Sequence, residues 1–213
     1  MRQSIVYFLS SSRNAIEISM KNKTILKKLK SVGYDLPKLK EGKVLNEEAT
    51  IMQMMYKEKY GNQYNNSQNF YTQKKDTEKN YKKHLQLARV AYYEDKEMIN
   101  RLHLGRQSYA VDQWLERAKT FYTVILDDTT KMNAFGISVS ELDQMLAEVE
   151  ALIASRQDQI SSKGEAQNAT QQRNDAFDAL DAWMRDFRKA ARFAMRDEPQ
   201  LLESLGIKVA STY

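Results

Sequence analysis

The sequence predicts an all-α helical bundle, and three observations support this prediction. Only two prolines and seven glycines occur in 213 residues, too few for the many short turns of an all-β fold. Apolar residues recur at steps of three and four over long stretches, which is the period of an amphipathic helix. A content of 42% hydrophobic and 29% charged residues provides enough apolar side chains for a folded core.

Several sequence landmarks recur at a constant spacing of 103 residues. The recurring pairs are Gly33 with Gly136, Gly61 with Gly164, and Ala-Arg-Val-Ala at 88–91 with Ala-Arg-Phe-Ala at 191–194. One offset held without a gap predicts two copies of one unit, although a repeat does not indicate which chemistry it performs. We therefore expect two tandem three-helix units, residues 1–104 and 105–213, packed as one body with pseudo-twofold symmetry.

The first expected helix of each unit carries one apolar face. In the first unit it covers about residues 4–32, and Gly33 supplies the left-handed residue that closes such a helix. Its counterpart covers about residues 111–135 and ends in the same way at Gly136.

The second expected helix of each unit begins at a capping residue. Ser138 followed by Glu141 is the pattern of a capping box, which predicts a helix over about 139–163. Asp35 stands at the equivalent position of the first unit, so the corresponding helix is expected over about 36–60.

Glycines are expected to weaken or interrupt these helices. Gly42 costs its helix about 1 kcal/mol relative to alanine, which favours fraying or a late start. Gly61 is expected to lie in a turn, and Gly164 in a turn or at a helix start, between the second helix and the third. Each unit is then expected to have a third long helix, at about 67–95 and 169–196, and a short helix, at about 97–102 and 200–205. The prediction is therefore six long helices and two short ones.

Residue types that usually carry catalysis or bind metals are scarce. The histidines His84 and His103 belong to no Glu-x-x-His pair, the motif of di-iron carboxylate bundles, and the chain has no cysteine. No phosphate-binding glycine loop, dinucleotide fingerprint or nucleophile elbow is present. We therefore expect no catalytic residue, no metal ligand and no cofactor.

The third helix of the first unit is polar where its counterpart is apolar. The 103-residue offset maps the apolar seam Ala176, Leu180, Trp183 and Phe187 onto a candidate interaction strip, Gln73, Thr77, Asn80 and His84. Burying these four groups without partners would be costly. Two interpretations stay open: the helix turns Tyr71, Tyr81, Leu85, Ala88 and Tyr92 inward instead, which we favour, or the strip lines a groove or a subunit contact.

Charge is distributed unevenly between the two units. Residues 1–103 carry a net charge of +9 and residues 104–213 a net charge of −4. Nine of the twelve tyrosines lie in the first unit, close to a candidate basic patch of Lys57, Lys59, Lys74, Lys75, Lys82 and Lys83. Lysines among aromatic residues can bind nucleic acid, but lysines on helices are commonly solubilising.

The ending of the chain, Ala191–Ile207, resembles the endings of some uncharacterised bacterial all-helical proteins. This resemblance implies a helical bundle and no activity.

Taken together, these features favour a non-catalytic helical interaction or scaffold protein with an unknown protein partner. The alternatives are a nucleic-acid-binding protein acting through the first unit and, third, an enzyme or small-ligand binder without a recognisable motif. The opposite charges of the two units also suggest a homodimer. No stretch approaches a membrane span, and the first apolar run is too short for a signal peptide, so we expect a cytoplasmic protein outside the membrane.

Overall fold

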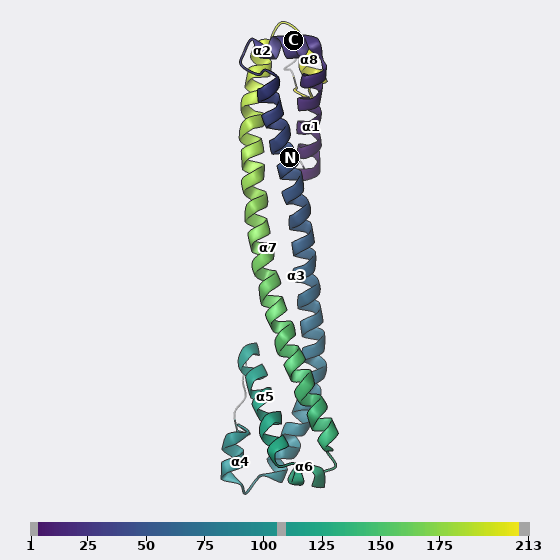
Figure 1. Cartoon of the computed structure of the whole chain (residues 1–213), viewed down its shortest axis with the longest axis vertical. Helices are drawn as coiled ribbons and strands as arrows, with labels where there is room; N and C mark the ends of the chain where they lie inside the picture. Colours follow the sequence, from purple (N-terminus) through teal and green to yellow (C-terminus); the bar gives the residue numbers. More distant parts are fainter. Residues whose placement is uncertain (1–3, 106–109, 209–213) are drawn as a thin grey trace. The chain divides into compact units, whose positions relative to one another are not determined.

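The computed structural model describes residues 4–105 and 110–208, and these residues form eight α-helices and no strand (Figure 1). The all-α prediction is confirmed. None of the helices within the described ranges combines the length and apolar composition needed to cross a membrane. The helices are α1 (Ile5–Lys21), α2 (Lys23–Lys30), α3 (Leu36–Ala91), α4 (Lys96–Arg101), α5 (Val111–Asp127), α6 (Thr130–Ala134), α7 (Val139–Ala194) and α8 (Pro199–Ser204).

The two long helices begin at the predicted capping residues. The backbone N–H of Lys38 donates to Asp35 Oδ1 at 3.1 Å, and that of Glu141 donates to Ser138 Oγ at 3.1 Å. Each cap satisfies a backbone N–H that has no partner inside the helix. As a result, α3 and α7 begin 103 residues apart, and they also end 103 residues apart.

The expected turns at Gly61 and Gly164 are absent from the structure. Both glycines lie inside continuous helices, so α3 and α7 are each single helices of 56 residues, and the prediction of six long helices is wrong. An isolated glycine costs a helix only about 1 kcal/mol, whereas an interruption requires a new helix nucleus and new caps. Packing on both sides of each glycine therefore outweighs its local preference.

The expected first helices are each divided in two. Asn22 interrupts residues 4–32 because its Oδ1 accepts the backbone N–H groups of Thr24 and Ile25, at 3.0 and 3.2 Å. Asp128 has the same effect between α5 and α6, where its Oδ1 accepts the N–H of Thr130 at 3.0 Å. Short polar side chains compete in this way with the hydrogen bonds of a continuing helix.

Left-handed residues end four of the helical segments. Within the described ranges the residues with positive φ are Gly33 (87°), His103 (51°), Gly136 (79°) and Gly206 (69°). In each case the next residue donates its N–H to the carbonyl five positions earlier, as Tyr34 does to Leu29 at 3.0 Å, which is the Schellman motif. The predicted caps at Gly33 and Gly136 are confirmed, and His103 and Gly206 form a second pair 103 residues apart.

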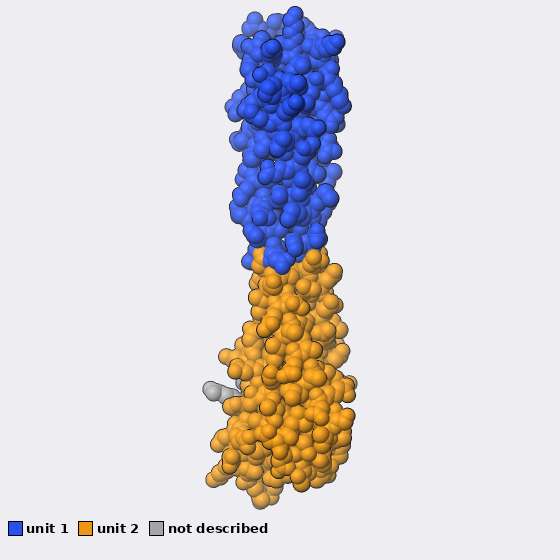
Figure 2. All heavy atoms as spheres, viewed as in Figure 1, with its two compact units in different colours: residues 1–60, 165–213 blue, residues 61–164 orange. Residues whose placement is uncertain are grey.

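The chain divides into two compact units (Figure 2). Unit 1 comprises residues 1–60 and 165–213, and unit 2 comprises residues 61–164. This division differs from the sequence units 1–104 and 105–213, since each compact unit takes segments from both. The physical reason is that α3 and α7 pair antiparallel within each unit.

Ion pairs and hydrogen bonds define this antiparallel pairing. Within unit 1, Lys59 Nζ of α3 pairs with Glu165 Oε2 of α7 at 2.9 Å. Within unit 2, the Gln159 side chain of α7 donates to Ser67 Oγ of α3 at 3.4 Å.

Each unit has its own apolar core. In unit 1 the rings of Trp183 and Phe187 stack with centroids 5.3 Å apart, and Tyr34 meets both edge-on. In unit 2, Tyr81 lies edge-on to Phe121 at 5.3 Å and also contacts Tyr122. The apolar seam predicted for the last long helix is confirmed at its centre, where Leu180, Trp183 and Phe187 are buried.

Candidate functional site

The four residues of the candidate interaction strip do not form one surface. Thr77 and His84 are buried, whereas Gln73 and Asn80 are exposed. The second set of residues, which we expected to face inward in place of the strip, is buried over most of its length. Tyr81, Ala88 and Tyr92 are buried and Leu85 is half-buried, but Tyr71 is exposed. The helix therefore buries parts of both stripes.

His84 is the centre of a hydrogen-bonded network in unit 2. Only 1% of its surface is exposed. Its Nδ1 lies 3.0 Å from Tyr122 Oη of α5, and its Nε2 lies 3.0 Å from Glu141 Oε1 of α7. A carboxylate can only accept, so Nε2 carries the proton and Nδ1 accepts from the Tyr122 hydroxyl. A neutral imidazole thus has a partner for both nitrogens.

The environment of this network favours a negative Glu141 and a neutral Tyr122. The hydrogen bond from His84 lowers the pKa of Glu141, and the nearby charge of Lys83 acts in the same direction. Burial raises the pKa of Tyr122. Both ring nitrogens of the buried His84 are paired, which indicates a structural histidine.

The sequence points to His84 but not to its pairing with Tyr122 or Glu141. The capping-box pattern predicts that the Glu141 carboxylate turns back to the start of its helix, and it faces His84 instead. Tyr122 lies on the apolar face of α5, where its sequence position resembles ordinary packing. Neither position gives a local signal of the pairing.

The lysines of the candidate basic patch are mostly engaged by carboxylates. Lys57 and Lys59 belong to unit 1, and the other four belong to unit 2. Within the described residues Lys57 and Lys75 form no ion pair. The ion-paired members are Lys59 with Glu165 (2.9 Å), Lys74 and Lys82 with Glu78 (2.7 and 2.9 Å), and Lys83 with Glu141 (3.5 Å). Three carboxylates therefore neutralise about half of the positive charge of these six lysines.

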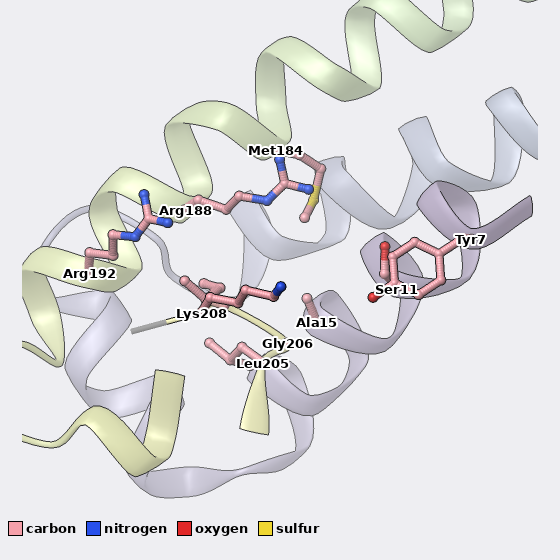
Figure 3. Close-up of a pocket in the computed structure, with 10 residues that line it drawn as sticks. Tyr7, Ser11, Ala15, Met184, Arg188, Arg192, Leu205, Gly206 and Lys208 are labelled. Atoms are coloured by element: carbon pink, nitrogen blue, oxygen red, sulfur yellow. The ribbon is translucent and has the colours of Figure 1, made fainter. Parts of the chain in front are cut away.

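A cavity in unit 1 gathers cations that are not neutralised in this way (Figure 3). This unit 1 cavity has a volume of about 280 Å³. Arg188 and Arg192 reach it from α7, Lys208 from the segment after α8, and Tyr7 and Ser11 from α1. Its apolar lining consists of Ala15, Met184, Leu205 and Ile207.

Two cations of α7 that are close to the cavity residues in sequence are ion-paired. Arg185 pairs with Asp181, and Lys189 pairs with Asp186. By contrast, Arg188, Arg192 and Lys208 form no ion pair with any residue that the structure describes, and no described carboxylate lines the cavity. The sequence analysis did not single out these three residues, although the four-residue step from Arg188 to Arg192 places them on one helical face.

A second feature of unit 1 is an apolar row on the outer side of α3. This row consists of Val44, Ile51, Met54 and Met55, whose exposed fractions range from 38% to 66%. The opposite side of the same helix is buried and includes Leu39, Ala49 and Gln53. Glu48 and Glu58 lie beside the row and form no ion pair within the described part of the chain.

Comparison with family models, with curated proteins and with solved structures gives no match for this chain.

Proposed function

We propose that the chain is a non-catalytic helical interaction protein whose α3 binds an amphipathic helix of a partner protein. The observation that carries the proposal is the apolar row of Val44, Ile51, Met54 and Met55. Single exposed apolar residues are ordinary, but four on one side of a helix within about three turns form an apolar strip, which Glu47 and Glu48 interrupt between Val44 and Ile51. Such strips are typical of binding surfaces.

The spacing of the row supports a helix as its occupant. The step of seven residues from Val44 to Ile51 and the step of three to Met54 follow a heptad pattern, which accepts the side chains of a second helix. Amphipathic helices bind grooves and faces through anchors at this spacing. Because Glu48 and Glu58 lie beside the row without ion pairs, a partner helix with lysine or arginine next to its apolar seam complements the charge.

The proposal includes two further expectations from the sequence. One is a cytoplasmic location. The other is that the helical framework arose by duplication, which is supported by the 103-residue offset between α3 and α7 and between the left-handed caps. Superposing residues 5–60 and 165–208 of unit 1 on residues 108–163 and 62–105 of unit 2 in an experimental structure tests the duplication. A different helix order in the two units would contradict it.

The binding test uses the full chain and a designed, fluorescently labelled helical peptide. The peptide has leucines at its a and d positions and lysines on both flanks. We expect saturable binding by fluorescence anisotropy, and we expect the double variant Ile51→Ser/Met54→Ser to weaken it by about tenfold or more, as for central interface residues. A peptide with glutamates on its flanks should bind less tightly.

Ile160→Ser provides the matched control. Ile160 is exposed to 54% and Ile51 to 53%, but Ile160 lies on α7 in unit 2. No binding of the lysine-flanked peptide, or an equal loss in the control variant, would contradict the proposal.

Light scattering at low and high salt tests the homodimer alternative. A dimer mass that disappears in Ile51→Ser would assign the row to a second copy of this chain and not to a partner helix. A salt titration against generic DNA tests the nucleic-acid alternative, since phosphate binding weakens steeply as salt rises.

A further inference from the structure

We propose that the unit 1 cavity binds the phosphate group of a small phosphomonoester. This inference is independent of the apolar row on α3 and uses a different surface of the same unit. It begins from the charge of the cavity: three cations reach it, and no described carboxylate lines it.

The three cations of the cavity repel one another only weakly, because Arg192 and Lys208 are exposed to solvent that screens their charge. Arg188 and Arg192 are one helical turn apart, and like charges at that spacing repel each other. Arg185, Lys189 and Arg196 of the same region each pair with an aspartate. The three cavity cations, which differ in having no such partner, are therefore available to a bound anion.

The cavity is lined by the types of donor that bind phosphate oxygens. Figure 3 shows Arg188 and Arg192 extending from α7, Lys208 from the segment after α8, and Tyr7 from α1 across the cavity. A guanidinium presents a flat fork of N–H donors that can bind phosphate through two parallel hydrogen bonds. The Lys208 ammonium adds a point charge, and the Tyr7 hydroxyl adds a further donor.

The number of cations and the size of the cavity narrow the ligand class. A phosphomonoester carries a charge of about −1.5 to −2 at pH 7 and three acceptor oxygens, which matches three cations better than a singly charged carboxylate does. The apolar residues Met184, Leu205 and Ile207 leave room for a small organic group. A volume of about 280 Å³ is just below the range of known ligand pockets, about 300–1,000 Å³, which favours a small ligand.

The test measures binding of two phosphomonoesters to the full chain. Glycerol 3-phosphate, titrated by calorimetry, represents a soluble ligand. Vesicles of phosphatidylcholine containing phosphatidate, assayed by co-sedimentation, represent a lipid headgroup with the same chemistry. We expect glycerol 3-phosphate to bind at millimolar concentration or below, with Arg188→Gln and Arg192→Gln each weakening it by about tenfold. Binding to the vesicles alone, with the same sensitivity to both variants, would identify the lipid as the source of the phosphate.

Arg185→Gln is the matched control, because Arg185 lies on the same helix but pairs with Asp181 outside the cavity. It should leave binding unchanged. Lys208→Gln is a second cavity variant that lies outside any helix, so it probes the site even if an α7 variant folds poorly. No binding of either phosphomonoester, or an equal loss in Arg185→Gln, would overturn the proposal.

Discussion

Gly42 of α3 lies directly against the indole ring of Trp183 on α7. A Cβ added at Gly42 would lie 2.5 Å from Cζ2 and 2.7 Å from Cζ3 of that ring, closer than atoms can pack. Trp183 is held in place because Phe187 stacks on it and Tyr34 meets its edge. The glycine that the sequence marks as a weakness of the helix is therefore the position that lets the two helices approach.

We expect Gly42→Ala to lower the free energy of unfolding. Overpacking a core costs about 1–3 kcal/mol, and the better helix propensity of alanine returns about 1 kcal/mol, so the net loss should be up to about 2 kcal/mol. Urea denaturation measures it. In a Trp183→Leu background the same substitution should become neutral or stabilising, and equal losses in both backgrounds would show that the ring is not the cause.

Gly61→Ala and Gly164→Ala should have the opposite effect. Both glycines lie inside long helices, and a Cβ added at either meets nothing within 4 Å. Each substitution should raise the free energy of unfolding by up to about 1 kcal/mol, because only the helix propensity changes. The comparison uses the same denaturation assay as Gly42→Ala, and a loss of stability at both sites would indicate that the glycines interrupt the helices after all.

His103→Gly should stabilise the chain. His103 has φ 51°, a left-handed conformation that costs a residue with a side chain about 1–2 kcal/mol. Glycine adopts it freely but loses about 0.5–1 kcal/mol more in entropy on folding, so the net gain should be up to about 1.5 kcal/mol. Thermal unfolding measures the gain. Gly206→His, the reverse change at the position 103 residues later, should destabilise, and a gain there would contradict the argument.

The pairing of His84 with Tyr122 predicts a measurable coupling energy. Tyr122→Phe leaves the buried Nδ1 of His84 without a donor, and His84→Leu leaves the Tyr122 hydroxyl without an acceptor. Each unpaired buried group costs about 1–3 kcal/mol. The double variant should therefore lose less stability than the two single losses added together, as measured by a double-mutant cycle. Strict additivity would mean that the hydrogen bond contributes nothing.

Glu141 should contribute to the pH dependence of stability. Its pKa is lowered in the folded chain, chiefly by the His84 hydrogen bond, so folding favours its charged form. That contribution is fully present above the unfolded pKa of about 4.3 and is lost as pH falls through the lower folded pKa. The Glu141→Gln chain should therefore have a lower free energy of unfolding than the original chain at pH 7. This difference should become smaller as pH falls below about 5. Denaturation curves at several pH values measure this difference, and a constant difference across that range would exclude the carboxylate as its source.

Much of the fold could be predicted because it depends on neighbouring residues. The caps at Asp35 and Ser138 and the left-handed glycines Gly33 and Gly136 each involve residues within about one helical turn. Whether Gly61 and Gly164 lie in a helix or in a turn could not be predicted in the same way, because packing of the helix on both sides of each glycine outweighs the local preference of glycine for a turn.

The candidate sites were less predictable because their residues meet only after folding. Tyr122 and Glu141 are 38 and 57 positions from His84 in sequence, and no pattern within α3 indicates either of them. Arg185 and Arg188 look alike along the chain, but one pairs with an aspartate and the other faces a cavity.

The sequence by itself determined the all-α class, the starts of α3 and α7, and the glycine caps at Gly33 and Gly136 that end the segments before them, since helical period and capping are local properties. Only the tertiary structure decided that Gly42 accommodates Trp183, that His84 is paired, and that three cations share one cavity. These features depend on which helical faces pack against one another. That packing is determined by the total apolar surface that residues far apart in sequence bury together, and not by any single segment.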